Sequence, residues 1–238
     1  MRTGRHRTLL RSFVRLTGFA CLGLWLLTVL LTLSLRWLTP PASSWMLQRC
    51  VAAWWHAQGC RVRYQWVAWQ AISPHIALAV VAAEDQKFPH HMGFDLGSIV
   101  EAWQAHQEGG RLRGASTISQ QVAKNLFLWP GRSVVRKGLE AYFTVLIELF
   151  WSKRRVLEVY LNVAEFGPDL FGVAAASQTF FDKPAAQLTA PEAALLAAVL
   201  PNPWQYHVQR PSAYVLHRHA WILRQMQQLG GPQYLRDL

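Results

Sequence analysis

Two neighbouring carboxylates stand at the end of an apolar segment, where they could take part in catalysis. Glu84 and Asp85 are the first acidic residues of the chain, and they directly follow the apolar run from Ile76 to Ala83. A carboxylate desolvated at the end of a buried helix is a better proton acceptor, which suits a general base. An ion pair between Glu84 and Lys87 would explain the pattern without catalysis, so the two residues alone leave both interpretations open.

A second cluster is rich in hydrogen-bonding side chains. Residues 114–125 read Gly-Ala-Ser-Thr-Ile-Ser-Gln-Gln-Val-Ala-Lys-Asn, which is too polar on too many faces for an ordinary core helix. Hydroxyl, amide and ammonium groups at this density can bind a sugar or a diphosphate. A solvated helix start would have a similar composition. The residues that could contact a ligand are Ser116, Thr117, Gln120, Gln121, Lys124 and Asn125.

A third cluster is cationic and repeats with the period of a helix. Arg132, Arg136 and Glu140 recur every four residues, so they share one helical face, and Lys137 lies beside them. An Arg136–Glu140 ion pair is the plainer explanation, and it would contribute only about 0.3–0.5 kcal/mol. Stacked arginines repel each other, however, unless an anion lies between them, and guanidinium groups bind phosphate oxygens in a bidentate manner. The cluster therefore indicates a diphosphate-binding site.

The segments that must position these clusters are predicted to be helical. Ser73 before Pro74, Ser152, and the Thr189–Glu192 capping box are helix-start signals, and strand-like alternation is scarce. One helix is expected to open at Asp95 or Ser98 and to close at Gly109-Gly110. The other expected helices cover about residues 73–84, 116–127, 133–150, 152–160, 189–200 and 212–229. These patterns predict a mainly α, single-domain fold.

The N-terminus has the features of a membrane anchor. Residues 1–15 form a basic tail with five arginines and no acidic residue, and the 20 residues from Leu16 to Leu35 carry no charge. About 20 apolar residues cross the ~30 Å hydrocarbon core of a bilayer, whereas a cleaved signal peptide usually has an apolar run of only ~7–15 residues. A retained transmembrane helix over residues 16–36 is therefore favoured. The positive-inside rule places the tail in the cytoplasm and the remaining chain outside.

The segment that follows, residues 37–70, is rich in tryptophan, and residues 71–238 form the main domain. The indoles of the segment either lie against lipid head groups or pack the edge of the domain; they are Trp45, Trp54, Trp55, Trp66 and Trp69. Cys50 and Cys60 lie outside the membrane, where a disulfide can persist. Their spacing leaves a disulfide and two free thiols equally open, and Cys21 falls inside the anchor.

The charge of the chain narrows the classes of partner. The net charge is +11 at pH 7, and after residue 36 the chain has 18 Lys and Arg against 13 Asp and Glu. This moderate excess suits phosphate groups or anionic lipids. Nucleic acid would fit the charge, but the sequence contains no zinc-finger, RNA-recognition or basic-zipper signature, so no nucleic-acid partner is expected.

Taken together, the clusters resemble the family 51 glycosyltransferases, the peptidoglycan transglycosylases. Four motifs in the order and spacing of the family are much more specific than one, and the resemblance extends over roughly residues 72–228. Ala115 departs from it, because many relatives have a second glycine there. The short chain and single anchor are similar to the monofunctional proteobacterial members. The motifs are Glu84-Asp85-x-x-Phe88-x-x-His91-x-Gly93, Gly114-x-Ser116-Thr117-Ile118-x-Gln120-Gln121-x-x-Lys124-Asn125, Arg136-Lys137-x-x-Glu140, and Ser152-Lys153 with Leu157-Glu158-x-Tyr160-Leu161-Asn162.

The resemblance implies a lysozyme-like domain with a small jaw lobe that touches the membrane, located outside a bacterial inner membrane. Its substrates would be lipid II as acceptor and a growing glycan chain on undecaprenyl diphosphate as donor. Glu84 would take the proton of the GlcNAc 4-hydroxyl, giving an inverted β-1,4 link. Proteins of cell division or cell-wall synthesis would be its partners besides membrane lipids. The chain has no Ser-x-x-Lys or Lys-Thr-Gly, so no transpeptidase activity is expected.

The resemblance also assigns roles to the other clusters. Lys124, Arg132 and Arg136, with Lys137, would neutralise the diphosphate, and Glu140 would act beside Glu84 by orienting these cations or a metal. No cofactor is required, although a divalent cation such as Mg or Mn near the diphosphate is compatible with the site. The remaining substrate-binding residues would be Ser116, Thr117, Gln120, Gln121, Asn125, Asp85, Phe88 and His91.

Two other functions fit parts of the pattern. A lytic transglycosylase or muramidase would share the lysozyme-like fold and need one catalytic glutamate, but it would not need the cationic residues Lys124, Arg132 and Arg136. A non-catalytic scaffold for cell-wall assembly would need neither Glu84 nor Glu140. New polymer from labelled lipid II identifies a synthase, fragments released from sacculi identify a lytic enzyme, and neither product identifies a scaffold.

The orientation of the anchor gives a first testable prediction. An alkaline phosphatase fused after Trp37 should be active, and a β-galactosidase fused at the same residue should be inactive, because the arginines of the tail keep it in the cytoplasm. Enzyme assays on cells that carry the two fusions measure this. The reverse pattern of activities would contradict the assigned topology.

Overall fold

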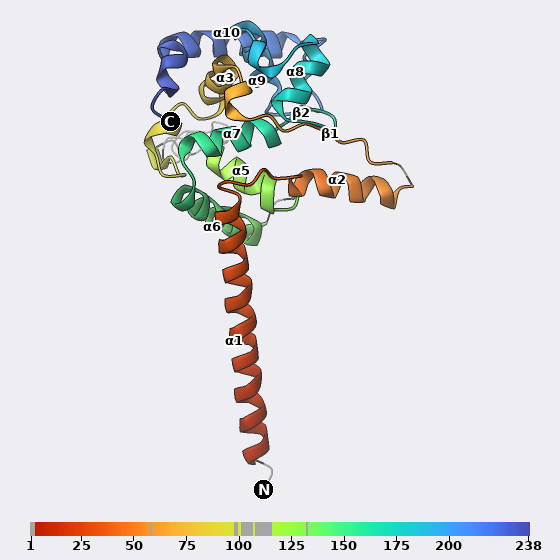
Figure 1. Ribbon diagram of the computed structural model, residues 1–238, viewed down its shortest axis with the longest axis vertical. Helices are drawn as coiled ribbons and strands as arrows, with labels where there is room; N and C mark the ends of the chain where they lie inside the picture. The colour runs from red at the N-terminus through yellow and green to blue at the C-terminus, as the bar shows by residue number, and fades with distance from the viewer. Residues whose placement is uncertain (1–2, 58, 98–99, 101–106, 108–115, 132) are drawn as a thin grey trace.

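The structure of the protein is a computed structural model, which describes residues 3–57, 59–97, 100, 107, 116–131 and 133–238, with side chains from residue 14 onward. Figure 1 shows a helical domain from which one long helix projects, so the mainly α fold is confirmed. The α-helices are α1 (Thr3–Ser34), α2 (Ser44–Trp55), α3 (Pro74–Glu84), α5 (Ile118–Phe127), α6 (Val134–Phe150), α7 (Lys153–Val163), α8 (Val173–Phe181), α9 (Ala190–Val199) and α10 (Ala213–Gln228).

Short elements connect these helices. A small sheet has the strand order β1-β3-β2, in which β3 runs parallel to β1 and antiparallel to β2. Its strands are β1 (Arg63–Tyr64), β2 (Glu165–Gly167) and β3 (Leu170–Phe171). The 3₁₀ helices are η1 (Trp69–Ala71), η2 (Phe88–His90), η3 (Ala185–Gln187) and η4 (Gly231–Leu235).

Helix starts follow the capping signals of the sequence. Ser73 and Ser152 accept hydrogen bonds from the backbone of the first turns of α3 and α7, as expected. Thr117 and Gln120 form a capping box at α5. The sequence patterns gave no indication of α2 and α8, and the helix expected after Asp95 lies largely outside the described residues.

The core is built around two helices that are apolar on all sides. Every residue of α3 from Ile76 to Ala82 is buried, as are most residues of α9, and the two helices pack against each other and against α10. Polar side chains are therefore confined to the ends of α3. The last residue of α3 is Glu84, so the core itself carries this carboxylate to the rim of the domain.

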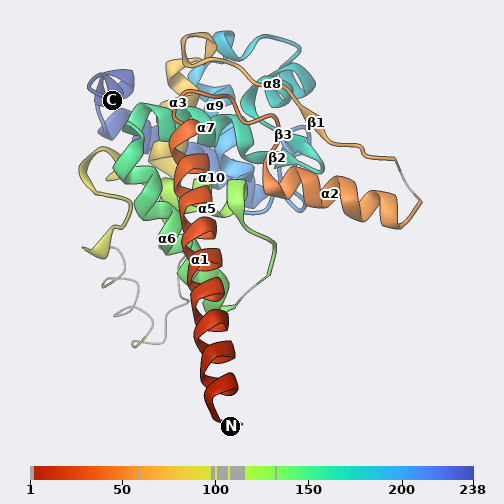
Figure 2. The same cartoon turned by 60° about the horizontal axis from the view of Figure 1, so that its bottom comes forward.

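The N-terminal helix is suited to a membrane. Within the described residues, α1 is long and apolar enough to cross a bilayer over Val14–Ser34, and the side chains of this span are largely exposed. Figures 1 and 2 show that it leaves the domain beside α6. This helix is consistent with a single-pass anchor, and it agrees with the expected span to within a few residues.

The anchor is attached to the domain through polar contacts at its C-terminal end. The hydroxyl groups of Thr28 and Tyr142 lie 2.8 Å apart, and the Trp151 indole donates to the carbonyl of Thr32 at 2.8 Å. Arg155 of α7 donates to the carbonyl of Leu35 at 2.9 Å, so it caps a free carbonyl just after the helix. These contacts fix the direction of the anchor relative to α6 and α7.

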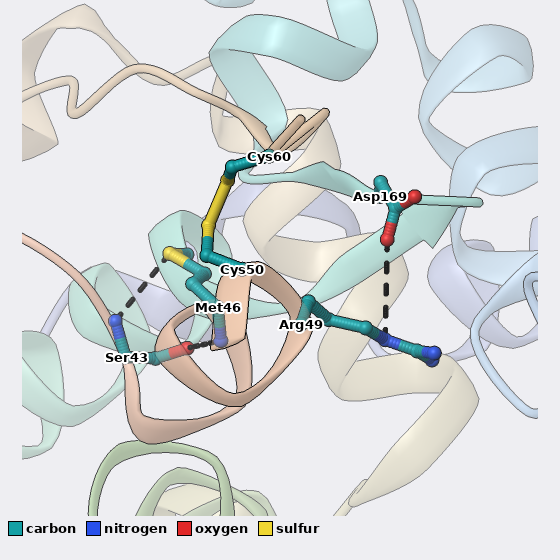
Figure 3. Close-up of a disulfide and its surroundings, with 6 residues drawn as sticks. All are labelled: Ser43, Met46, Arg49, Cys50, Cys60 and Asp169. Atoms are coloured by element: carbon teal, nitrogen blue, oxygen red, sulfur yellow. Dashed lines mark hydrogen bonds and ion pairs between the residues drawn. A yellow bond between two sulfur atoms is a disulfide. The ribbon is translucent and has the colours of Figure 1, made fainter. Parts of the chain in front are cut away.

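The juxtamembrane segment forms α2 and is tied down at both ends. Ser44 and Gln48 donate to the carbonyl of Leu128 after α5. At the other end, Cys50 and Cys60 form a disulfide, which decides the alternative that the sequence left open (Figure 3). Of the tryptophans of the segment, Trp45, Trp66 and Trp69 pack against the core, as one alternative expected. Trp54 and Trp55 are exposed, and for them contact with lipid head groups stays a prediction.

Gly172 holds the junction between the sheet and α8. Its φ angle of 83° lies in the left-handed region, and a Cβ atom there would lie 2.6 Å from the carbonyl oxygen of Asn162. Asn162 in turn donates to the carbonyl of Val67 and accepts from its N–H, which fixes the chain ahead of α3. A side chain at Gly172 would therefore displace the backbone that carries β3.

Replacing Gly172 by alanine should destabilise the protein by at least about 2 kcal/mol, because the left-handed conformation and the backbone clash both cost energy. Gly138 is the matched control, since it lies in α6 with nothing within 4 Å of its would-be Cβ. Alanine there should be neutral or stabilise by up to ~1 kcal/mol. Thermal unfolding in detergent measures both variants, and equal melting temperatures would contradict this role of Gly172.

Candidate active site

Glu84 is held between two helices that are distant in sequence. Its Oε2 accepts a hydrogen bond from the Gln121 side chain of α5 at 3.0 Å, and its Oε1 accepts from Arg218 of α10 at 3.3 Å. The side chain keeps 15% of its surface exposed. The carboxylate is therefore fixed in direction and still reachable, as a proton acceptor must be. The expected pairing with Lys87 is absent from the described contacts, where Lys87 pairs with Asp95.

Asp85 points the other way, into the protein. Its carboxylate accepts from the backbone N–H of Ile118 at 3.0 Å and lies 2.9 Å from Nε2 of His91. Ile118 is the first residue of α5, so Asp85 ties the end of α3 to the start of α5. Phe88 is fully buried. The expectation that Asp85, Phe88 and His91 bind substrate stays a prediction, because their observed contacts are within the protein.

The polar residues of α5 divide into two groups by the direction of their side chains. Thr117 and Gln120 are buried at the helix start, where they cap it, and the Thr117 hydroxyl also donates to the carbonyl of Gly93 at 2.6 Å. Ser119 is buried as well and donates to Glu148. Ser116 is half-buried ahead of the cap. The second group, Gln121, Lys124 and Asn125, lines a cavity of about 170 Å³.

This cavity is called the active-site cavity below. Its lining also includes residues that were not among the predicted site residues. Trp45 of α2 and Glu165 of β2 both line it. Tyr160 at its base donates to the Gln121 carbonyl at 3.2 Å, which turns the amide NH₂ toward Glu84. Burial, and next the Glu84 carboxylate, raise the pKa of the Tyr160 hydroxyl well above its usual range, so it remains a donor.

The cationic cluster meets this cavity through Lys124. Burial lowers the pKa of the Lys124 ammonium, whereas the carboxylate of Glu140 raises it. Glu140 is 3% exposed; its oxygens accept from Arg136 at 2.9 Å and from Lys137. The plain Arg136–Glu140 ion pair is thus present. Among the described residues, Nε of Arg136 is buried without a hydrogen-bond partner, which leaves a donor for an anion. Arg132, Gly114 and Ala115 lie outside the described residues.

A metal centre held by protein side chains is a further possibility at such a site. No group of three or more His, Cys, Asp or Glu side chains in the described ranges is arranged to hold a metal ion. Both oxygens of Glu140 are occupied by Arg136 and Lys137. The described side chains therefore do not fit a resident metal, and the expectation that a divalent cation accompanies the diphosphate stays a prediction.

Arg218 is the main site residue that the sequence analysis missed. It lies in α10, far along the chain from Glu84, and it donates both to the Glu84 side chain and to the carbonyl of Ala83 at 3.2 Å. A single arginine on a half-polar helix gives no local signal of such a role. Tyr160 had a weak signal, since it belongs to the fourth motif. Trp45 belonged to the tryptophan-rich segment, for which packing was one expected role.

Comparisons with known proteins show the family of the chain. A family model described as Transglycosylase matches residues 54–227. The chain is 53% identical over 230 residues to a biosynthetic peptidoglycan transglycosylase of Ectopseudomonas mendocina, which covers 97% of this chain and 95% of the relative. It is 54% identical to a protein of the same description from Shewanella oneidensis over 88% and 89% of the two chains. One from Escherichia coli O1:K1 is 55% identical over 94% and 97%.

The buried ammonium of Lys124 should cost the protein stability. Its pKa in the folded state is lowered from 10.5, so between the lowered value and 10.5 the unfolded chain binds more protons and stability rises with pH. Lys124→Met should therefore melt at a higher temperature than the wild type at pH 7. The difference should shrink as the pH approaches 10.5.

The control is Lys87→Met, because the Lys87 side chain is 56% exposed and should give no such gain. Thermal unfolding of the three proteins in detergent across this pH range provides the measurement. A Lys124→Met variant that is less stable than the wild type at pH 7 would show that the ammonium supports the fold.

Proposed function

The chain belongs to the Transglycosylase family and is a peptidoglycan glycosyltransferase, and from this premise we propose that it polymerises lipid II into glycan strands at the bacterial inner membrane. The donor would be the growing chain on undecaprenyl diphosphate, and the acceptor would be the GlcNAc unit of lipid II. The observation that carries the proposal is the position of Glu84, which is held by Gln121 and Arg218, because Gln121 also lines the active-site cavity.

The proposed step moves one proton and exchanges one bond. The Glu84 carboxylate takes the proton of the GlcNAc 4-hydroxyl, and that oxygen attacks the anomeric carbon of the donor from the face opposite the diphosphate. The new bond is a β-1,4 link with inverted configuration, and the bond to undecaprenyl diphosphate breaks. Hydrogen bonds from Gln121 and Arg218 orient the Glu84 carboxylate before the reaction. The carboxylate therefore does not have to be oriented during the approach to the transition state.

The departing diphosphate needs cations more than it needs an acid. Lys124 stands at the cavity, and Arg136 and Lys137 are linked to it electrostatically through Glu140. We propose that these residues, with Arg132, neutralise the charge that develops on the leaving group. Since diphosphate leaves without protonation, a single carboxylate suffices, whereas a hydrolase of finished glycan needs a carboxylic acid at the leaving oxygen. No transpeptidase step is proposed, because the sequence lacks Ser-x-x-Lys and Lys-Thr-Gly.

The α1 span and its contacts with the domain support the proposal that the enzyme acts at a membrane surface. A lipid-linked donor and acceptor both remain in the bilayer, so a catalytic cavity must lie close to the head groups. Trp45 of α2 and Asn125 at the end of α5 line the cavity next to the segment that follows the anchor. We propose that the periplasmic face of the inner membrane is where the enzyme meets lipid II, with the N-terminus in the cytoplasm.

Replacing Glu84 by glutamine should lower polymerisation of labelled lipid II by at least ~10²-fold, because the amide cannot accept the hydroxyl proton. The control is Asp237→Asn, which removes an exposed carboxylate from the C-terminal segment and should keep full activity. Gel analysis of the glycan products and a melting curve are recorded for each variant. Activity of Glu84→Gln above a tenth of wild type would rule out this base.

The cations should contribute unequally, according to their burial. The Arg136 side chain is 12% exposed and keeps an unpaired Nε, whereas the Lys137 side chain is 52% exposed. Arg136→Lys keeps the charge but loses the planar fork, and should lower the polymerisation rate about tenfold. Lys137→Ala should change it by no more than about threefold, as for an exposed pair. Equal effects, or losses that follow the melting temperature, would mean that the cluster is structural.

A further inference from the structure

A second cavity borders the same small sheet as the active-site cavity. Its volume is about 510 Å³. Glu165 of β2 and Phe171 of β3 border the active-site cavity, whereas Gly167 and Leu170 of the same two strands border the second cavity. Pro203 borders both cavities. A polymer that extends from the active-site cavity across Pro203 would therefore enter the second cavity directly.

The residues that line this second cavity are basic and aromatic. Arg63 of β1 and Arg210 of the loop before α10 are both exposed, and His207 is also part of the lining. Phe180 and Tyr206 give it aromatic walls. None of the described residues that line it is acidic. The Arg63 guanidinium donates one hydrogen bond to the Thr179 hydroxyl, at 3.3 Å, and is otherwise available to an anion.

The sizes of the two cavities indicate what each can hold. Pockets that enclose a drug-sized ligand measure about 300–1,000 Å³. The active-site cavity, at about 170 Å³, is smaller than this range. The second cavity falls inside the range. The second cavity adjoins the active-site cavity at Pro203, so it is a space of suitable size for the peptide of a glycan strand.

The position of this cavity argues against a lipid head group as its occupant. It is lined by Thr179 and Phe180 of α8, and Figures 1 and 2 both show α8 at the end of the domain remote from the N-terminal part of α1. A bilayer around α1 would surround the opposite end of the molecule. The anion that Arg63 and Arg210 meet is therefore expected to come from the periplasmic solution or from the product.

We propose that the second cavity binds the peptide stem of the glycan strand, with Arg63 and Arg210 pairing its carboxylates. This proposal rests on the proposed function, because that reaction supplies strands whose alternate sugars carry acidic peptides. The aromatic walls contact the apolar side chains of the peptide, and the two guanidinium groups fix its carboxylates. The second cavity would keep the product strand positioned at the active-site cavity while the next disaccharide unit is added.

The test uses the full-length protein in detergent with Glu84→Gln, so that bound strands are not extended. Two probes are compared by fluorescence anisotropy: uncrosslinked glycan strands that carry stem peptides, and the same strands after an amidase has removed the peptides. Replacing both Arg63 and Arg210 by alanine should weaken binding of the peptide-bearing strands at least about tenfold. Binding of the stripped strands should stay unchanged, and lysine at both positions should restore part of the affinity.

Arg236→Ala is the matched control, since Arg236 is exposed in the C-terminal segment and should have no effect. Equal loss of both probes, or no loss of either, would overturn the proposal. A variant that instead loses binding to phosphatidylglycerol vesicles would overturn it in favour of a lipid site. With Glu84 intact, the double variant should keep the initial rate of lipid II polymerisation. A wild-type protein that does not polymerise lipid II would refute the proposed function. The comparison of the two strand probes tests the peptide site independently of that result.

Discussion

The arrangement of the active site depends on the Asp85 carboxylate, which connects α3 to α5. It accepts the first backbone N–H of α5 and lies against His91, so it connects the end of the buried helix α3 to the start of α5. Its neighbour Glu84 then has to face outward, toward the side chains that α5 presents on its next turn. A buried carboxylate is tolerable here because each oxygen has a hydrogen-bond partner and the helix dipole favours its charge. Glu84 is thus the proposed base, and Asp85 is the group whose contacts position it.

The active site is also coupled to the membrane anchor by short contacts. Arg155 caps the end of the anchor and pairs with Glu158, whose other oxygen accepts the backbone N–H of Trp69 ahead of α3. Through α2, the Ser44 hydroxyl contacts the carbonyl of Asn125 at the end of α5. A movement of the anchor would therefore be transmitted to α3 and α5, the two helices that hold Glu84 and Lys124. This rigidity would suit the proposed function, in which lipid-linked substrates are confined to one depth in the bilayer.

Much of this architecture could be predicted from the sequence, because its signals are local. Helix starts at Ser73 and Ser152 follow from capping chemistry, and the anchor follows from composition. Glu84 was predicted as a site residue from its place after an apolar run and from the motif around it. The functions of Thr117 and Gln120 could not be read in the same way, because a polar side chain that caps a helix and one that binds a sugar look alike in sequence. Arg218 was missed because its contact with Glu84 exists only after folding.

The central claim is that Asp85 acts by positioning Glu84 and not by binding substrate itself. A double-mutant cycle of Glu84→Gln and Asp85→Ala, read as catalytic efficiency on lipid II with the melting temperature recorded for each protein, tests it most directly. Asp85→Ala should lower activity about tenfold or more in the wild type, on the scale of a misplaced catalytic group. In the Glu84→Gln protein it should cost nothing further. Independent, additive losses would contradict the account and would return Asp85 to the substrate-binding residues.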